Sequence, residues 1–134
     1  MNAFGTAWLT LAVVFGLHAL DEAATDFLAW YNPTAKRIRS HLGGIPFPPV
    51  FTFWPWLLGL LSVTGVLLAL SPLAYGHVVW LFPVAIVLST INIGNGLLHI
   101  ISAILLKRRV PGLISAPFLL ASAGWLLYSA LRSM

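Results

Sequence analysis

Three ionisable residues lie close together in an otherwise apolar N-terminal stretch: His18, Asp21 and Glu22. On a helix, His18 and Glu22 are four residues apart and share a face, and Asp21 lies beside them. Each charged side chain at the centre of a membrane-spanning helix costs roughly 2.5–3.5 kcal/mol unless it finds a partner or water. Because of that cost, an ionisable cluster of this kind indicates a functional site.

A second polar group lies later in the chain, at Asn92, Asn95 and His99. Its spacing of i, i+3 and i+7 places all three residues on one helical face. We expect the two polar faces to meet, because polar side chains inside a membrane pair with one another rather than face lipid. Imidazoles and carboxylates without sulfur suit a divalent ion such as zinc, manganese or iron. The sequence therefore predicts His18, Glu22 and His99 as metal ligands.

Such a site suits Lewis-acid or acid–base catalysis. A bound metal ion can activate an ester, a phosphoester or a carbonyl group. Without a metal, burial shifts carboxylates and histidines toward neutral pH, where they serve as general acids and bases. We predict Glu22 and Asp21 as the catalytic groups. The spacing of His18, Asp21 and Glu22 differs from H-E-x-x-H, so the motif does not assign a zincin.

A structural role competes with each of these assignments. His18 and a neighbouring carboxylate can form an ion pair that only joins helices. Asn92 and Asn95 are more typical of interhelical hydrogen bonds than of metal ligation. Asp26 lies near the expected membrane interface, where water solvates it.

The elements that position these groups must be membrane helices. Of the 134 residues, 60% are hydrophobic and 7% are charged, which excludes a soluble globular domain. The absence of cysteine excludes disulfides and thiolate metal sites. The first apolar stretch has neither a basic n-region nor a small-residue cleavage site, so we interpret it as a retained helix. The length indicates one domain over residues 1–134.

Four stretches are long and apolar enough to span a membrane. The expected spans are residues 3–30, 50–70, 77–106 and 113–131. Together they predict an all-α fold, namely a four-helix transmembrane bundle that crosses the cell membrane several times.

The basic residues predict the orientation of this bundle. Six of the seven follow the first or the third span: Lys36, Arg37, Arg39, Lys107, Arg108 and Arg109. In a four-span protein these two loops share a side, which the positive-inside rule places in the cytoplasm. Both termini are then expected on the non-cytoplasmic side. At 1.5 Å per residue, Glu22 and His99 each lie about 12 Å from the cytoplasmic interface, so we expect them at matched depth.

These motifs together resemble a small bacterial membrane family named for its HXXEE signature. The segment His18-Ala19-Leu20-Asp21-Glu22 matches that signature, with aspartate in place of the first glutamate. The segments Asn95-Gly96-Leu97-Leu98-His99 and Lys107-Arg108-Arg109-Val110-Pro111-Gly112 resemble the family's second histidine and its tyrosine-x-Pro-Gly element. Arg109 stands where that family has tyrosine. The resemblance implies a bacterial inner-membrane protein with an intramembrane site of His18, Asp21, Glu22 and His99, and it implies no particular reaction.

Three functions fit the sequence. The first is a metal-dependent or acid–base membrane enzyme, such as a hydrolase, transferase or isomerase, acting on a lipid-like or other hydrophobic substrate near the cytoplasmic leaflet. The second is a non-catalytic accessory subunit whose polar cluster fixes helix packing. The third is a proton-coupled small transporter, which we favour least because four spans with one polar cluster form a thin pathway. We expect membrane lipids as partners and no nucleic acid, and both a homo-oligomer and a larger membrane complex stay open.

Overall fold

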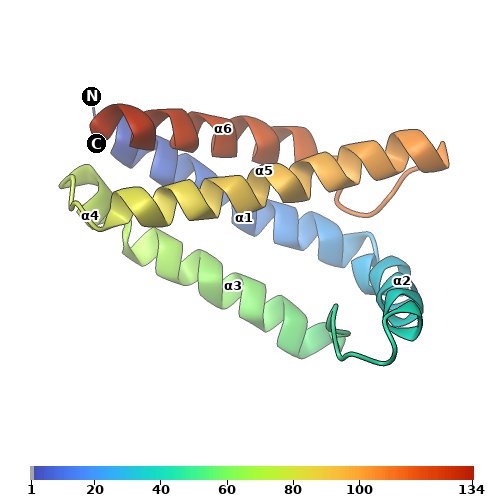
Figure 1. Cartoon of the computed structure of the whole chain (residues 1–134). Coiled ribbons are helices and arrows are strands. Elements are labelled where there is room, and N and C mark those ends of the chain that lie inside the picture. Colours follow the sequence, from blue (N-terminus) through green and yellow to red (C-terminus); the bar gives the residue numbers. More distant parts are fainter. Residues whose placement is uncertain (1) are drawn as a thin grey trace.

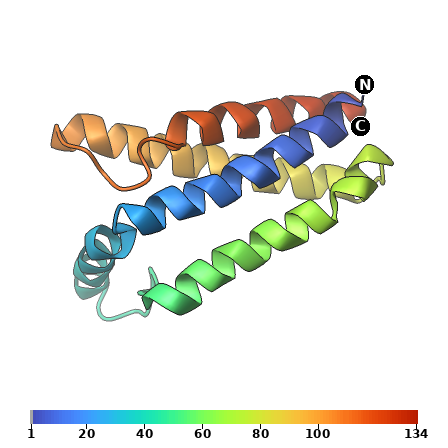
Figure 2. The ribbon, with the colours of Figure 1, turned by 180° about the vertical axis from the view of Figure 1, so that it is seen from behind.

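The computed structural model describes residues 2–134, and every regular element in that range is a helix. The helices are α1 (Ala3–Ala24), α2 (Phe27–His41), α3 (Phe53–Ala69), α4 (Ser71–Tyr75), α5 (Leu81–Leu106) and α6 (Ala116–Ser133). Figure 1 shows α1, α3, α5 and α6 side by side along one direction, with α2 turned across one end. The two termini lie together at the opposite end (Figure 1). Seen from behind, α1 lies between α3 and α6 (Figure 2).

The buried core is formed mainly by α1, α5 and α6, with Leu67 of α3 and Ala74 of α4 at its side. Its large side chains are Phe4, Trp8, Leu11, Leu81, Phe82, Leu119 and Leu126. Small residues let the helices approach closely: a Cβ added at Gly96 of α5 would lie 3.1 Å from the carbonyl oxygen of Ala116 on α6. On the other side of α1, the buried Trp8 Nε1 donates a hydrogen bond of 2.8 Å to the Leu67 carbonyl of α3. Helix α1 is therefore the central helix, packed on both sides.

Three segments of residues 2–134 are long and apolar enough to cross a membrane, namely α1, the run Phe53–Tyr75 of α3 and α4, and α5. They correspond to the first three expected spans. Helix α6 is not among them, because its serines and Arg132 make it less hydrophobic. The crossing of a fourth helix therefore stays a prediction.

The first expected span, residues 3–30, does not form one helix. Helix α1 ends at Ala24, and α2 begins at Phe27 in a new direction. Asp26 between them has a left-handed backbone with φ of 58°, a conformation that cannot continue a right-handed helix. The Thr25 hydroxyl also donates to the Asp21 carbonyl, at the last turn of α1. The prediction of a continuous helix to Trp30 is wrong because this local break was not anticipated.

The other helix boundaries differ from the expected spans by a few residues. Helices α3 and α4 together form a run from Phe53 to Tyr75, which extends beyond the expected end at 70. Helix α5 begins at Leu81 rather than at 77, because His77 has a positive φ of 52°. Helix α6 covers Ala116–Ser133 instead of 113–131. These shifts leave the order of the helices unchanged.

Both basic segments lie at the end of the bundle away from the termini. Lys36, Arg37 and Arg39 are on α2, and Lys107, Arg108 and Arg109 directly follow α5. Figure 1 shows α2 and the last turns of α5 at that same end. The predicted clustering of basic charge at one end is therefore present in the fold.

Candidate functional site

The buried cluster consists of His18 and Glu22 on α1 and His99 on α5. Glu22 Oε1 lies 3.5 Å from His18 Nε2 and 3.0 Å from His99 Nε2. The exposed fractions of these residues are 1% for His18, 5% for Glu22 and 2% for His99. One ligand atom from each residue lies within 4.8 Å of the others. The cluster therefore brings three potential metal-ligand atoms together at one buried position.

The parallel course of α1 and α5 brings the cluster together. Both helices run from the end that holds the termini toward the basic end (Figure 1). Glu22 and His99 therefore lie at the same level along the bundle, as the count of residues from the basic segments predicts. The predicted approach of the two polar faces is confirmed by the Glu22–His99 distance of 3.0 Å.

Ser115 and Asp21 form a second layer around His18. Ser115 Oγ lies 2.7 Å from His18 Nδ1 and donates to Asp21 Oδ2 at 2.6 Å. The Ser115 backbone N–H also donates to Asp21 Oδ2, at 3.0 Å. These bonds tie the start of α6 to the end of α1. They also hold the His18 ring in one orientation.

The hydrogen bonds of Ser115 decide which nitrogen of His18 carries the proton. A serine hydroxyl has one proton to donate, and its short bond to Asp21 uses that proton. The Ser115 oxygen must then accept from His18 Nδ1–H. A neutral His18 therefore has a lone pair on Nε2, where Asn95 Nδ2 donates at 3.3 Å. This lone pair and Glu22 Oε1 are two electron-rich atoms 3.5 Å apart.

The two asparagines have different surroundings. Asn95 reaches across to His18, in agreement with its predicted interhelical role. Asn92 is buried and donates to the Leu88 carbonyl of its own helix at 2.9 Å. Within residues 2–134, Asn92 makes no side-chain hydrogen bond to another helix, so the predicted interhelical role is not seen for it; its amide donates to the carbonyl one turn earlier on α5 instead.

Aromatic rings of α2 and α3 cover His99. The ring centroids of Phe27 and Trp30 lie 5.9 Å and 6.5 Å from that of His99. Trp56 of α3 stacks on Phe27 at 5.7 Å. His99 Nδ1 is buried without a hydrogen-bond partner in residues 2–134. The turn of the chain at Asp26 therefore places an apolar cover over His99.

The loop between α5 and α6 lies directly against the cluster. A Cβ added at Gly112 would lie 2.9 Å from Glu22 Cγ, 2.9 Å from His99 Cε1 and 3.1 Å from His18 Cε1. Gly112 also has a positive φ of 74°, and its N–H donates to Thr25 Oγ1 at 3.1 Å. Only glycine combines this backbone conformation with such a close approach. The peptide at Gly112 thus forms one wall of the buried cluster.

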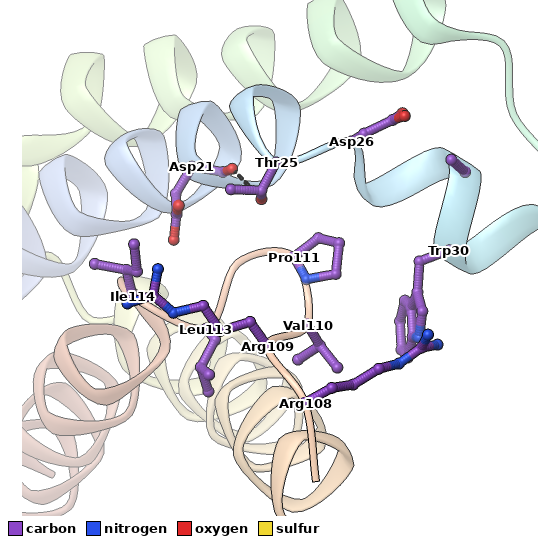
Figure 3. A pocket seen from close by; sticks show the side chains of 11 residues that line it. Asp21, Thr25, Asp26, Trp30, Arg108, Arg109, Val110, Pro111, Leu113 and Ile114 are labelled. Carbon is purple, nitrogen blue, oxygen red and sulfur yellow. Dashed lines mark hydrogen bonds between the residues drawn. The ribbon is translucent and has the colours of Figure 1, made fainter. Parts of the chain in front are cut away.

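An open pocket of about 440 Å³ is lined in part by this loop, through Pro111 and Leu113 on either side of Gly112. Figure 3 shows its lining from the end of α1, the start of α2 and the loop before α6. Asp21 lies in this wall and is half-buried, so it connects the pocket to the second layer around His18. Asp26 is exposed at the same pocket, as its predicted solvation requires.

The sequence predicts the buried cluster but not the residues that support it. Thr25, Gly112 and Ser115 were not predicted, although Pro111-Gly112 belongs to one of the motifs described above. Ser115 lies about 97 positions from the histidine that it holds, so no local spacing connects them. The only available signal was the glycine itself, since a glycine after proline in a short connection often marks a tight turn.

Comparison with known proteins agrees with the resemblance noted in the sequence. A family described as "Protein of unknown function with HXXEE motif" matches residues 8–126. This range includes the buried cluster, Ser115 and the Gly112 loop. No curated protein and no solved structure matches the chain significantly.

Proposed function

The chain belongs to the HXXEE-motif family, and we propose that it is an integral membrane enzyme that binds one divalent metal ion through His18, Glu22 and His99. The observation that carries this proposal is the spacing of the donors. Two ligands about 2.0–2.1 Å from a tetrahedral zinc ion lie roughly 3.3–3.4 Å apart. Glu22 Oε1 lies 3.0 and 3.5 Å from the two imidazole nitrogens. A cation would also stabilise the Nε2 lone pair of His18 facing the carboxylate of Glu22.

The second layer supports metal binding in the same way. A metal-bound histidine usually donates its other ring N–H to a carboxylate, a carbonyl or a similar acceptor, which fixes its tautomer. His18 Nδ1–H donates to Ser115 Oγ, and Ser115 donates to Asp21. A set of two histidines and one carboxylate leaves an open position in catalytic zinc sites.

We assign the reaction to an ester or phosphoester bond of a lipid-like substrate. When bound, the ion supplies Lewis-acid polarisation of an ester or phosphoester oxygen. Asp21 holds the Ser115 hydroxyl and lines the open pocket, so it is the group placed to accept a proton from a reactant there. The aromatic cover over His99 excludes water from the buried side of the site.

We also propose how the protein is placed in the membrane. All four long helices cross the cell membrane, the bacterial inner membrane in the native host, with both termini outside. The basic end and the site then lie toward the cytoplasmic leaflet. This orientation is supported by the position of the basic segments on α2 and after α5, and by the apolar length of three helices.

The specific alternative is a structural ion pair. The 3.0 Å contact between Glu22 and His99 is also a hydrogen-bond distance, and a buried charged pair can hold two helices together without a metal. In a non-catalytic accessory subunit, the only role of this cluster would be to fix the packing of α1 against α5.

Metal analysis of the detergent-purified protein tests the proposal. We expect close to one zinc, manganese or iron ion per chain, lost in Glu22→Gln and His99→Ala while the helices stay folded by circular dichroism. Asp26→Asn and His41→Ala are matched controls, since both residues are exposed and outside the cluster; they should retain the ion.

The structural alternative expects the opposite pattern. The wild type would contain no metal, and each single change would strand a buried partner and destabilise the fold by about 3–5 kcal/mol. A double change of Glu22 and His99 to leucine would then restore stability and leave the protein functional in the cell. That outcome would refute the enzyme assignment.

A further inference from the structure

The pocket outside the Gly112 loop has two arginines in its lining, Arg108 and Arg109. Figure 3 shows the Arg108 side chain extending toward Trp30 and the Arg109 side chain extending the other way, toward Ile114. Val110 and Pro111 lie between them (Figure 3). The two guanidinium groups thus border the pocket on different sides.

Neither arginine forms an ion pair with a carboxylate of residues 2–134. The ion pairs within residues 2–134 all involve Glu22 and a histidine. Asp21, an acidic residue of the pocket lining, accepts two hydrogen bonds from Ser115. Asp26 extends away from the two arginines in Figure 3. The arginines therefore keep their charge and their N–H donors free for a ligand.

Apart from the two arginines, Asp21, Thr25 and Asp26, the wall is apolar or amphipathic. Ala29, Val110, Pro111, Leu113 and Ile114 line it together with Trp30. Ile114 is 63% exposed, so the pocket opens beside a hydrophobic surface. Guanidinium groups bind phosphate oxygens through paired N–H donors, and tryptophan favours the level of lipid headgroups. The combination suits a ligand with an anionic head and an apolar body.

From this lining we infer that the pocket binds the phosphate headgroup of an anionic phospholipid between Arg108 and Arg109, which border it on two sides. The inference rests on the proposed function and specifies its substrate class as a phosphate-bearing lipid. Pro111 and Leu113 line the pocket, and Gly112 between them lies against the buried cluster and donates its N–H to Thr25 of the pocket wall. The headgroup therefore binds next to the site where the reaction takes place.

Native mass spectrometry of the detergent-purified protein tests this binding. The probes are phosphatidic acid, phosphatidylglycerol and phosphatidylcholine, added one at a time. The variant is R108Q/R109Q, and the matched control is K36Q/R37Q, which removes two exposed charges of α2 at the same end of the bundle but outside the pocket. Metal content is measured on every sample.

We expect one tightly bound anionic lipid on the wild type and preference over phosphatidylcholine. R108Q/R109Q should bind that lipid at least about tenfold more weakly, because each arginine supplies charge-assisted hydrogen bonds. K36Q/R37Q should bind the lipid within about twofold of the wild type. Exposed charges outside the pocket attract an anionic lipid only weakly, and they form no defined hydrogen bonds with it. Glu22→Gln should keep the lipid even where it loses the metal, which separates this inference from the proposed function.

Three results would overturn the inference. Equal binding by R108Q/R109Q and the wild type would exclude the arginines. An equal loss in K36Q/R37Q would indicate only general attraction of anionic lipid to a basic surface. Displacement of the lipid by millimolar inorganic phosphate would assign the pocket to free phosphate instead of a lipid headgroup.

Discussion

Replacing Gly112 with alanine measures how closely the loop before α6 covers the buried cluster. The new Cβ would lie 2.9 Å from both Glu22 Cγ and His99 Cε1. Neither neighbour is the free end of an exposed side chain, so the overlap must be relieved by moving the loop or the cluster. Overpacking of this kind costs about 1–3 kcal/mol. The positive φ of 74° adds about 1–2 kcal/mol for any residue with a Cβ.

Gly43→Ala is the matched control for the backbone contribution. Gly43 has a similar φ of 69°, and a Cβ there would meet nothing within 4 Å. It should therefore show only the conformational cost of about 1–2 kcal/mol. The difference between the two variants isolates the contact with the cluster, and we expect it to be about 1–3 kcal/mol.

Unfolding by sodium dodecyl sulfate in mixed micelles, followed by tryptophan fluorescence, gives the two free energies. A larger loss for Gly112→Ala, together with reduced metal content, is the expected result. Equal losses for the two variants, with unchanged metal content in Gly112→Ala, would refute the close cover of the cluster by this loop.

Three further predictions concern the support, the protonation and the orientation of the site. Ser115→Ala removes the bond that orients His18, and it should weaken zinc binding by about 10–100-fold in a competition titration with a chelator; unchanged affinity would exclude Ser115 as an orienting group. Metal affinity should fall as the pH decreases from 7 to 5, because protons compete for the imidazole nitrogens; equilibrium dialysis with zinc would measure this, and a pH-independent affinity would contradict histidine ligation. A reporter fused after Met134 should report the non-cytoplasmic side, and a cytoplasmic signal would refute the predicted orientation.

The contact of Glu22 with His99 could be predicted because it depends on regular geometry. Both residues lie on helices that run toward a basic segment, so a count of residues at 1.5 Å each gives their relative depth. The helical face shared by Asn95 and His99 follows from the same periodicity. Hydrophobic length and basic charge are properties of whole segments. Predictions based on them are therefore not affected by errors of a few residues at the helix ends.

The break at Asp26 and the role of Ser115 could not be predicted in that way. The break depends on one left-handed residue in a stretch whose composition still suits a helix. Without it, Phe27 and Trp30 would continue along α1 rather than turn over His99. Ser115 contacts His18 and Asp21 only because the loop returns to the cluster, and no sequence periodicity describes a returning loop.

The exposed end of α5 is where members of the family are expected to differ in length. Helix α5 continues from His99 to Leu106, about 10 Å beyond the cluster, and Figure 1 shows this end projecting past α6. Its last residues Ile104, Leu105 and Leu106 are exposed, and the chain then returns to Gly112. Insertions and deletions are tolerated where backbone is exposed and makes no long-range bonds. Insertions and deletions among relatives should therefore fall in this projecting end of α5 and the chain that follows it. The segment from Gly112 to Ser115 should keep its length of four residues, because its two ends are hydrogen-bonded to Thr25 and Asp21 at the end of α1.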